Sequence, residues 1–147
     1  MKKVLFGVIF IAIIGIAGWV IISRQPEKNT LRIECFEENF ADGSVIQAKF
    51  SFDNDSVSGT LAYLWAQKDN STGTFEGTIK NNVIFGNYHF FSEEVWSDNQ
   101  VAFFYDGQSL VPGYGEQNAD GTGFVNPDSL TFDQKNKLIK TACPLAL

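Results

Sequence analysis

The sequence predicts an all-β fold, an antiparallel meander that closes into a small β-barrel, preceded by one N-terminal transmembrane helix. Three observations predict the barrel. Apolar and polar residues alternate with period 2 through much of residues 31–147, as they do in half-buried strands. Turn-forming residues separate these stretches at short intervals, and no segment after Ile22 shows helical periodicity. A β-sandwich is the alternative, because it is built from similar strands.

The alternation is clearest between residues 57 and 90. Two consecutive stretches, 57–65 and 73–80, place their odd-numbered residues on one apolar face. Asn81 and Asn82 then form a two-residue link that tolerates the positive φ of a hairpin turn. The next strand continues the apolar face on even-numbered residues. The predicted apolar face consists of Val57, Gly59, Leu61, Tyr63, Trp65, Gly73, Phe75, Gly77, Ile79, Ile84, Gly86, Tyr88 and Phe90.

Glycine repeatedly lies two positions before a large apolar residue on this face. The pairs are Gly59 and Leu61, Gly73 and Phe75, Gly77 and Ile79, and Gly86 and Tyr88. A site without a side chain leaves room for a large ring on a neighbouring strand, and it lets the strand coil as barrel closure requires. A phosphate-binding loop is disfavoured, because these glycines lie inside alternating runs and do not open a helix.

Further strands are expected on both sides of this region. Asp106-Gly107 and Asp120-Gly121 are turn signals, and Asp53-Asn54-Asp55 reads as a hairpin turn in preference to a calcium loop. The additional predicted strands are Leu31–Glu37, Val45–Phe52, Val95–Tyr105, Leu110–Glu116, Ser129–Phe132 and Leu138–Cys143.

Residues 1–24 are expected to form a signal anchor, and residues 25–30 a linker to an exported domain at 31–147. Residues 4–22 are nineteen positions without a charge, which is just long enough to cross a lipid bilayer as a helix. Lys2 and Lys3 favour a cytoplasmic N-terminus. The alternative is a cleaved signal peptide, because Gly15-Ile16-Ala17 offers small residues for processing. Both interpretations export the domain.

The exported part is acidic, with seven basic and sixteen acidic residues from Asn29 onward. This balance argues against nucleic acid as a partner, since phosphate binding needs clustered Lys and Arg. The chain has two cysteines, Cys35 and Cys143. In an oxidising compartment they predict a disulfide that places the terminal strands side by side. A thiol pair for redox or metal chemistry lacks CxxC spacing, so we expect no metal and no cofactor.

The run SGTLAY…KDNSTGTFEGTIKNNVIFGNYHFFSEE…VAFFYDG…LVPGYGE, between the two cysteines, resembles a family of small exported bacterial domains, often lipoproteins, with no established function. The most specific parts are GNYHFFSE at 86–93 and GYGE at 113–116. The resemblance implies a β-barrel-like fold in the bacterial envelope. Together with the charge-free segment at 4–22, this location predicts a single-pass inner-membrane protein with a periplasmic domain. The lipidation cysteine of the lipoproteins is missing, and the resemblance implies no catalytic residues.

Aromatic residues near predicted strand ends are the candidates for a binding site. Small barrels bind apolar or peptide ligands at the mouth or in the interior, and aromatic rings supply much contact area. The alternative is that these rings only fill the core. The candidates are Tyr63, Trp65, Tyr88, Trp96 and Tyr114.

The sequence offers one cluster that resembles an acid/base site, Glu93-Glu94 with His89 and Asp98 nearby. Paired carboxylates can divide acid and base roles. Adjacent strand residues face opposite sides, however, so both glutamates cannot line one pocket unless a bulge intervenes. A solvated strand end is therefore the favoured interpretation, and no catalytic residue is assigned.

Three functions remain open. The chain could be a ligand-binding barrel, a structural or interaction domain whose acidic surface contacts another envelope protein, or a hydrolase that uses Glu93 or Glu116. We favour a binding or interaction module over an enzyme, because the two glutamates have no visible partner groups. A cavity in the barrel would favour the first function.

Overall fold

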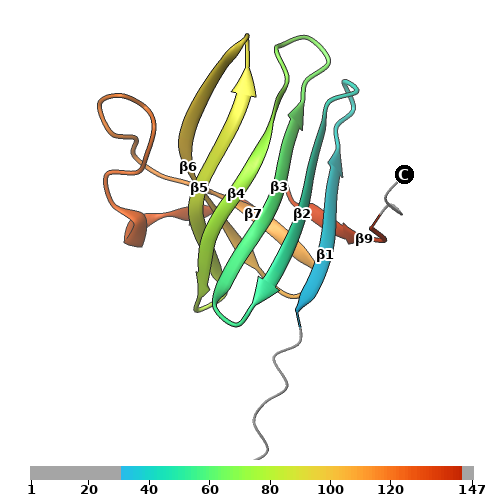
Figure 1. The fold of residues 1–147 in the computed structure, drawn as a ribbon, viewed down its shortest axis with the longest axis vertical. Helices are drawn as coiled ribbons and strands as arrows, with labels where there is room; N and C mark the ends of the chain where they lie inside the picture. Colours follow the sequence, from blue (N-terminus) through green and yellow to red (C-terminus); the bar gives the residue numbers. More distant parts are fainter. Residues whose placement is uncertain (1–30, 144–147) are drawn as a thin grey trace, which may run out of the picture.

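The computed structural model describes residues 31–143 and shows an all-β fold (Figure 1). The strands agree closely with the predicted ranges. One difference is that β8 is reduced to two residues, since Ser129 belongs to a short 3-10 helix, η1 (Pro127–Ser129). The strands are β1 (Arg32–Asn39), β2 (Val45–Asp53), β3 (Ser56–Leu64), β4 (Ser71–Lys80), β5 (Val83–Ser92), β6 (Val95–Tyr105), β7 (Ser109–Tyr114), β8 (Thr131–Phe132) and β9 (Leu138–Thr141).

Eight of these strands close into an antiparallel barrel, which confirms the predicted architecture over the sandwich. Strands β1 to β6 form a meander in which each strand pairs with the next, and β6 continues to β7. The barrel closes because β9 pairs with both β7 and β1. Strand β8 lies outside the cylinder and pairs only with the end of β7. Figure 1 shows β1–β6 as a curved sheet in front of β7 and β9.

The predicted disulfide is present and lies at the closure of the barrel. Cys35 on β1 is bonded to Cys143, just after β9, with their Cα atoms 5.1 Å apart. Cys35 also pairs in register with Thr141 of β9. The bond therefore joins the first and last strands of the cylinder, as expected from the two cysteine positions.

The barrel interior is filled by aromatic rings beside the inward-facing glycines. Gly59 lies in register between Phe50 of β2 and Phe75 of β4, whose ring centroids approach to 4.9 Å. Gly77 and Gly86 face each other across β4 and β5. A Cβ on either would stand 2.8 Å from the tip of the Phe75 ring, and closer still to backbone atoms. The structural role predicted for these glycines is confirmed.

The two ends of the barrel differ, and we name them by their turns. The upper end carries the loops at 40–44 and 65–70 and the turn at 93–94. The lower end carries the turns at 54–55, 81–82 and 106–108. Two of the hairpins use the same turn type, because Asn81, Asn82, Glu93 and Glu94 all have positive φ between 50° and 65°, as in a type I′ turn.

The segment between β7 and β9 covers part of the outside of the barrel. Phe124 packs against Phe85 of β5, with ring centroids 6.3 Å apart, and Phe132 of β8 packs against Phe104 of β6 at 5.9 Å. Phe85 and Phe104 point outward, because their neighbours Ile84 and Phe103 fill the core. This cover explains why β6 is apolar on both faces in its second half.

The predicted anchor at 1–24 and linker at 25–30 lie outside the described residues. Within residues 31–143, no helix is long and apolar enough to span a membrane.

Candidate functional site

The lower end of the barrel is closed by a buried charge network around Glu34. The Glu34 carboxylate is 3% exposed and pairs with the Arg32 guanidinium at 2.7 Å and the Lys140 ammonium at 2.8 Å. The Tyr105 hydroxyl donates a hydrogen bond of 2.8 Å to the same carboxylate. Its charge is therefore compensated on several sides, as a buried carboxylate requires. Arg32 also stacks over the Phe52 ring, 4.8 Å from its centroid.

The upper end is hollow. A cavity of about 260 Å³ lies where β6 and β7 part, and its lining includes Val101, Phe103 and Pro112, together with Phe124 of the covering segment. A second hollow of about 160 Å³ lies next to it, toward β1 and β9. Ile46, Trp65, Pro112 and Tyr114 line both hollows.

Three of the five predicted binding residues surround this upper cavity. Tyr63 and Trp65 stack on each other with centroids 5.9 Å apart, and both line the cavity with Tyr114. Burial raises the pKa of the Tyr63 hydroxyl far above its usual range, and the nearby Tyr88 and Tyr114 add to this shift. Among the described residues, the Tyr63 hydroxyl has no hydrogen-bond partner. It is therefore available as a polar contact in a cavity whose lining is mostly apolar.

The other two predicted residues lie elsewhere. Tyr88 is only 2% exposed and belongs to the core, where it stacks on Phe90 with centroids 4.8 Å apart. Its hydroxyl donates to the Ser71 hydroxyl at 3.3 Å. Trp96 is 60% exposed on the outside of β6. The structure thus brings together Tyr63, Trp65 and Tyr114 and separates Tyr88 and Trp96 from the cavity.

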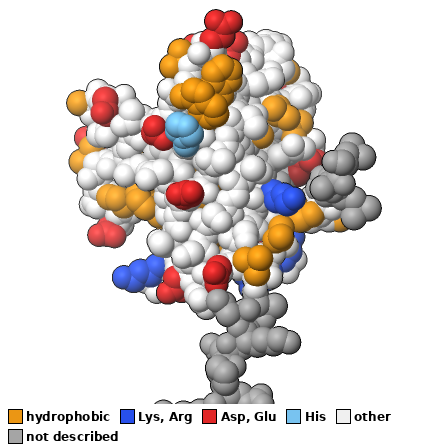
Figure 2. Space-filling view, viewed as in Figure 1, with side chains coloured by type: hydrophobic (Ala, Val, Ile, Leu, Met, Phe, Trp, Pro, Cys, Tyr) orange, Lys and Arg blue, Asp and Glu red, His pale blue; other side chains and the backbone are white. Residues whose placement is uncertain are grey.

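Trp96 belongs to an aromatic patch on the outer surface. The His89 ring stacks on Trp96 with centroids 4.7 Å apart, and Phe91 contacts the same indole at 5.3 Å. His89 Nδ1 lies 2.8 Å from an Asp98 oxygen. Figure 2 shows hydrophobic side chains beside the histidine, with acidic side chains around them. Both members of the His89–Asp98 pair are at least half exposed, so they lack the cleft that acid/base chemistry needs.

Glu93 and Glu94 form the turn between β5 and β6 and are exposed, as expected for a solvated strand end. A hydrogen bond with Asp69, together with the charge of that carboxyl, raises the pKa of Glu93. Glu116 lies beyond the end of β7 and is also exposed. None of the three glutamates lines the upper cavity. Within residues 31–143, no group of His, Cys, Asp or Glu is arranged to hold a metal ion.

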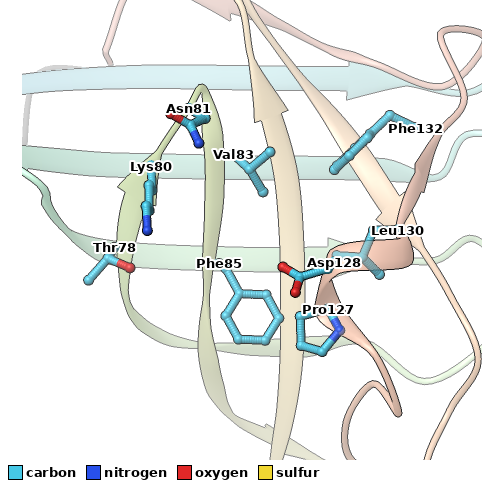
Figure 3. Close-up of a pocket in the computed structure, with 9 residues that line it drawn as sticks. All are labelled: Thr78, Lys80, Asn81, Val83, Phe85, Pro127, Asp128, Leu130 and Phe132. Carbon is cyan, nitrogen blue, oxygen red and sulfur yellow. The ribbon is translucent and has the colours of Figure 1, made fainter.

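A groove of about 410 Å³ lies on the outside of the barrel (Figure 3). The outward side chains of β4 and β5 form one wall, and the segment around η1 forms the other. Its polar lining residues are all exposed, and they are Thr78, Lys80, Asn81 and Asp128. The groove therefore offers no buried polar contact that would select a ligand.

Sequence reasoning missed two parts of this arrangement. Phe124 and Gln100 also line the upper cavity, but Phe124 belongs to an irregular segment where no periodicity indicates a facing. The burial of Glu34 was also not predicted. It could have been inferred from β1, because Arg32, Glu34 and Phe36 share one face of that strand, which places a charged pair beside a core ring.

The fold and the cavity define a small closed β-barrel that is sealed by charges at one end and open at the other. The sequence matches no protein-family model, and comparison with curated proteins and with solved structures found no match. The barrel agrees with the fold that the resemblance to small envelope domains implies, and the disulfide agrees with the pairing expected from the two cysteines. No family is identified for the chain.

Proposed function

We propose that this protein is a binding module whose upper barrel cavity receives an apolar group of a small ligand or a peptide. The observation that carries the proposal is the cavity of about 260 Å³ bordered by Tyr63, Trp65 and Tyr114. Ligand sites are typically concave and apolar with a few polar groups, and the Tyr63 hydroxyl supplies such a group. The sealed lower end makes the upper end the route of access.

An apolar fluorescent probe, N-phenyl-1-naphthylamine, tests the proposal on the full-length protein. The probe should bind with increased emission, and Val101→Phe, which places a ring in the cavity, should weaken binding about tenfold, or 1.4 kcal/mol. Trp96→Ala removes the central ring of the outer aromatic patch and serves as the matched control. Binding that is lost in Trp96→Ala and kept in Val101→Phe would place the probe on the outer surface and contradict the proposal. Thermal melts verify that both variants are folded.

We place this module in the bacterial envelope, anchored in the inner membrane by residues 4–22 with the barrel in the periplasm. The charge-free run after two lysines supports the anchor, and the disulfide supports an oxidising compartment. Membrane fractionation combined with protease access tests this. A soluble species that begins near Gly18 would show that the segment is a cleaved signal peptide instead.

The proposal assigns no catalytic role. Glu93 and Glu116, the residues of the hydrolase alternative, are exposed and lie outside the cavity lining. An envelope protein that contacts the acidic surface remains the second candidate function. It is favoured by the exposed patch of Phe91 and Trp96, which are 44% and 60% exposed, and Trp96→Ala would weaken such an interaction.

A further inference from the structure

Among the described residues, strand β6 has no ladder partner on its second edge at residues 95–99, above the point where it meets β7. The β6–β7 ladder contains only Phe103, Phe104 and Tyr105 of β6. On the same edge, the Gln100 N–H donates to the Thr122 carbonyl. In the described ladders, residues 95–99 pair only with β5. The strands of the barrel therefore part in the upper half of the β6–β7 boundary, which we call the seam.

The geometry shows which backbone groups face the seam. Successive residues of a strand direct their N–H and C=O groups to opposite edges. The Gln100 N–H points away from β5, toward Thr122, whereas the Tyr105 N–H points toward Asn82 on the β5 side. By this alternation, the N–H and C=O groups of Trp96 and Asp98 face the seam. An extended chain could pair with them as an added strand.

The seam borders the upper cavity, next to the point where Phe124 also lines it. Val101 of β6 and Tyr114 of β7 line that cavity from the two sides of the seam. A volume of about 260 Å³ is below the roughly 300–1,000 Å³ of pockets for drug-sized molecules. It is closer to the space needed by one large side chain. A strand paired with β6 would direct alternate side chains inward, so one of them could enter the cavity.

The charges around the seam favour a basic partner. Glu94 precedes β6, Asp98 lies on it, and Glu116 follows β7, and all three carboxylates are exposed. Across the chain the net charge is −6. A second copy of the same chain would bring like charges together at this edge, which disfavours pairing between two barrels.

We propose that the occupant of the upper cavity is an apolar side chain of an extended basic peptide, which pairs with β6 at residues 95–99 as an added strand. This inference rests on the proposed binding function and narrows its ligand to a peptide segment of a partner protein. Backbone hydrogen bonds to the edge give affinity, the cavity selects one large apolar side chain, and the carboxylates select flanking lysine or arginine.

The test uses the full-length protein and a short, capped, fluorescein-labelled peptide that alternates lysine with threonine and has one leucine at its centre. Binding is measured by fluorescence anisotropy. Two further peptides carry N-methyl groups on alternate amides, in complementary sets. One set should lose at least about tenfold in affinity and the other should bind as before, because only alternate amides face the edge. Equal binding of the two sets would overturn the added strand.

Protein variants separate this inference from the proposed function. Val101→Phe should weaken both the peptide and N-phenyl-1-naphthylamine. Asp98→Asn with Glu94→Gln should weaken only the peptide, and Glu76→Gln on the outer face of β4 is the matched control. If the naphthylamine probe binds and the peptide does not, the cavity function stands and the peptide inference falls. A peptide with glutamate in place of lysine that binds equally well would also overturn it.

Discussion

The Tyr105 hydroxyl donates a hydrogen bond of 2.8 Å to the Glu34 carboxylate, across a sequence separation of 71 residues. The bond links β6 to β1 through the barrel interior and completes the charge network at the lower end. The Tyr105 ring also packs on Phe52 and Phe36, with centroids 5.2 Å and 6.1 Å away. One side chain thus joins the aromatic core to the buried carboxylate.

This contact predicts a loss of stability in alkaline solution. Burial raises the pKa of Tyr105 from 10.0 to about 12, and the hydrogen bond to Glu34 contributes. The unfolded chain releases this proton near pH 10, whereas the folded barrel retains it. The stabilisation is therefore complete below about pH 10 and is lost as the pH rises toward 12.

Denaturant unfolding of the wild type and of Tyr105→Phe at several pH values measures this effect. Tyr105→Phe should be less stable at neutral pH by about 1.5–3 kcal/mol, the range for a hydrogen bond to a charged group. Its stability should also fall less steeply above pH 10. Parallel stability curves for the two proteins would show that this proton does not contribute.

The glycine pair of β4 and β5 predicts a second effect. Gly86→Ala should destabilise the barrel by at least about 1–3 kcal/mol, the usual cost of overpacking. The reason is that a Cβ at this site lies 2.8 Å from Phe75 and closer to the backbone of β4. Thr78→Val on the same sheet is the control, because Thr78 is exposed and valine favours strands. Equal melting temperatures for the two variants would contradict the packing argument.

Removal of the disulfide should leave the fold intact but lower its stability. Cys35 and Cys143 close a loop with a sequence separation of 108, for which the chain-entropy model gives up to about 4–5 kcal/mol. We expect Cys35→Ala with Cys143→Ala to melt at a lower temperature with an unchanged circular dichroism spectrum. Two free thiols in the exported wild-type protein, detected by mass analysis, would contradict the bond itself.

The alternation of side chains made most of this fold predictable. From Val57 to Phe90 the buried residues lie at the expected positions, because each strand has one face in the core and one in water. The pair Asn81-Asn82 marked its turn through its tolerance of positive φ. Cys35 and Cys143 indicated which strands meet at the closure.

The strand β1 shows where alternation alone is insufficient. Leu31 and Ile33 are apolar, yet they are 61% and 53% exposed, and Glu34 is buried on the opposite face. The inversion depends on Lys140 and Tyr105, which come from distant strands. Burying a carboxylate is tolerated when such partners compensate its charge, and no local pattern reveals them.

The alternation of side chains also made part of the candidate site predictable. Tyr63 and Trp65 share the inward face of one alternating run, and Tyr114 lies at the end of another strand. The cavity itself follows from the way β6 and β7 part, since their ladder includes only three residues of β6. The register between strands is a tertiary property that the sequence does not reveal. For this reason Trp96, which lies outside the cavity, was predicted as a binding residue together with Tyr114, which lines it.

The turn at Glu93-Glu94 gives the last prediction. Both residues have positive φ, 50° and 63°, a conformation that is uncommon for side chains other than glycine, asparagine and aspartate. Glu93 also lies beside the Asp69 carboxyl, which raises its pKa. At neutral pH the turn therefore combines an unfavourable backbone conformation with two neighbouring acids.

Glu93→Asn with Glu94→Gly should raise the melting temperature, because Asn-Gly is the preferred pair for this turn type. The matched control is Asn81→Ala with Asn82→Ala, at the other end of the sheet. It replaces residues that favour the same positive-φ conformation with residues that do not, so it should lower the melting temperature. Differential scanning calorimetry measures both shifts. If Asn-Gly at 93–94 gives no rise while the control falls, another contact of Glu93 or Glu94 stabilises the turn, and that contact would be lost in the variant. The same variant removes an acid next to the seam, so it should also weaken the basic peptide while leaving the naphthylamine probe bound.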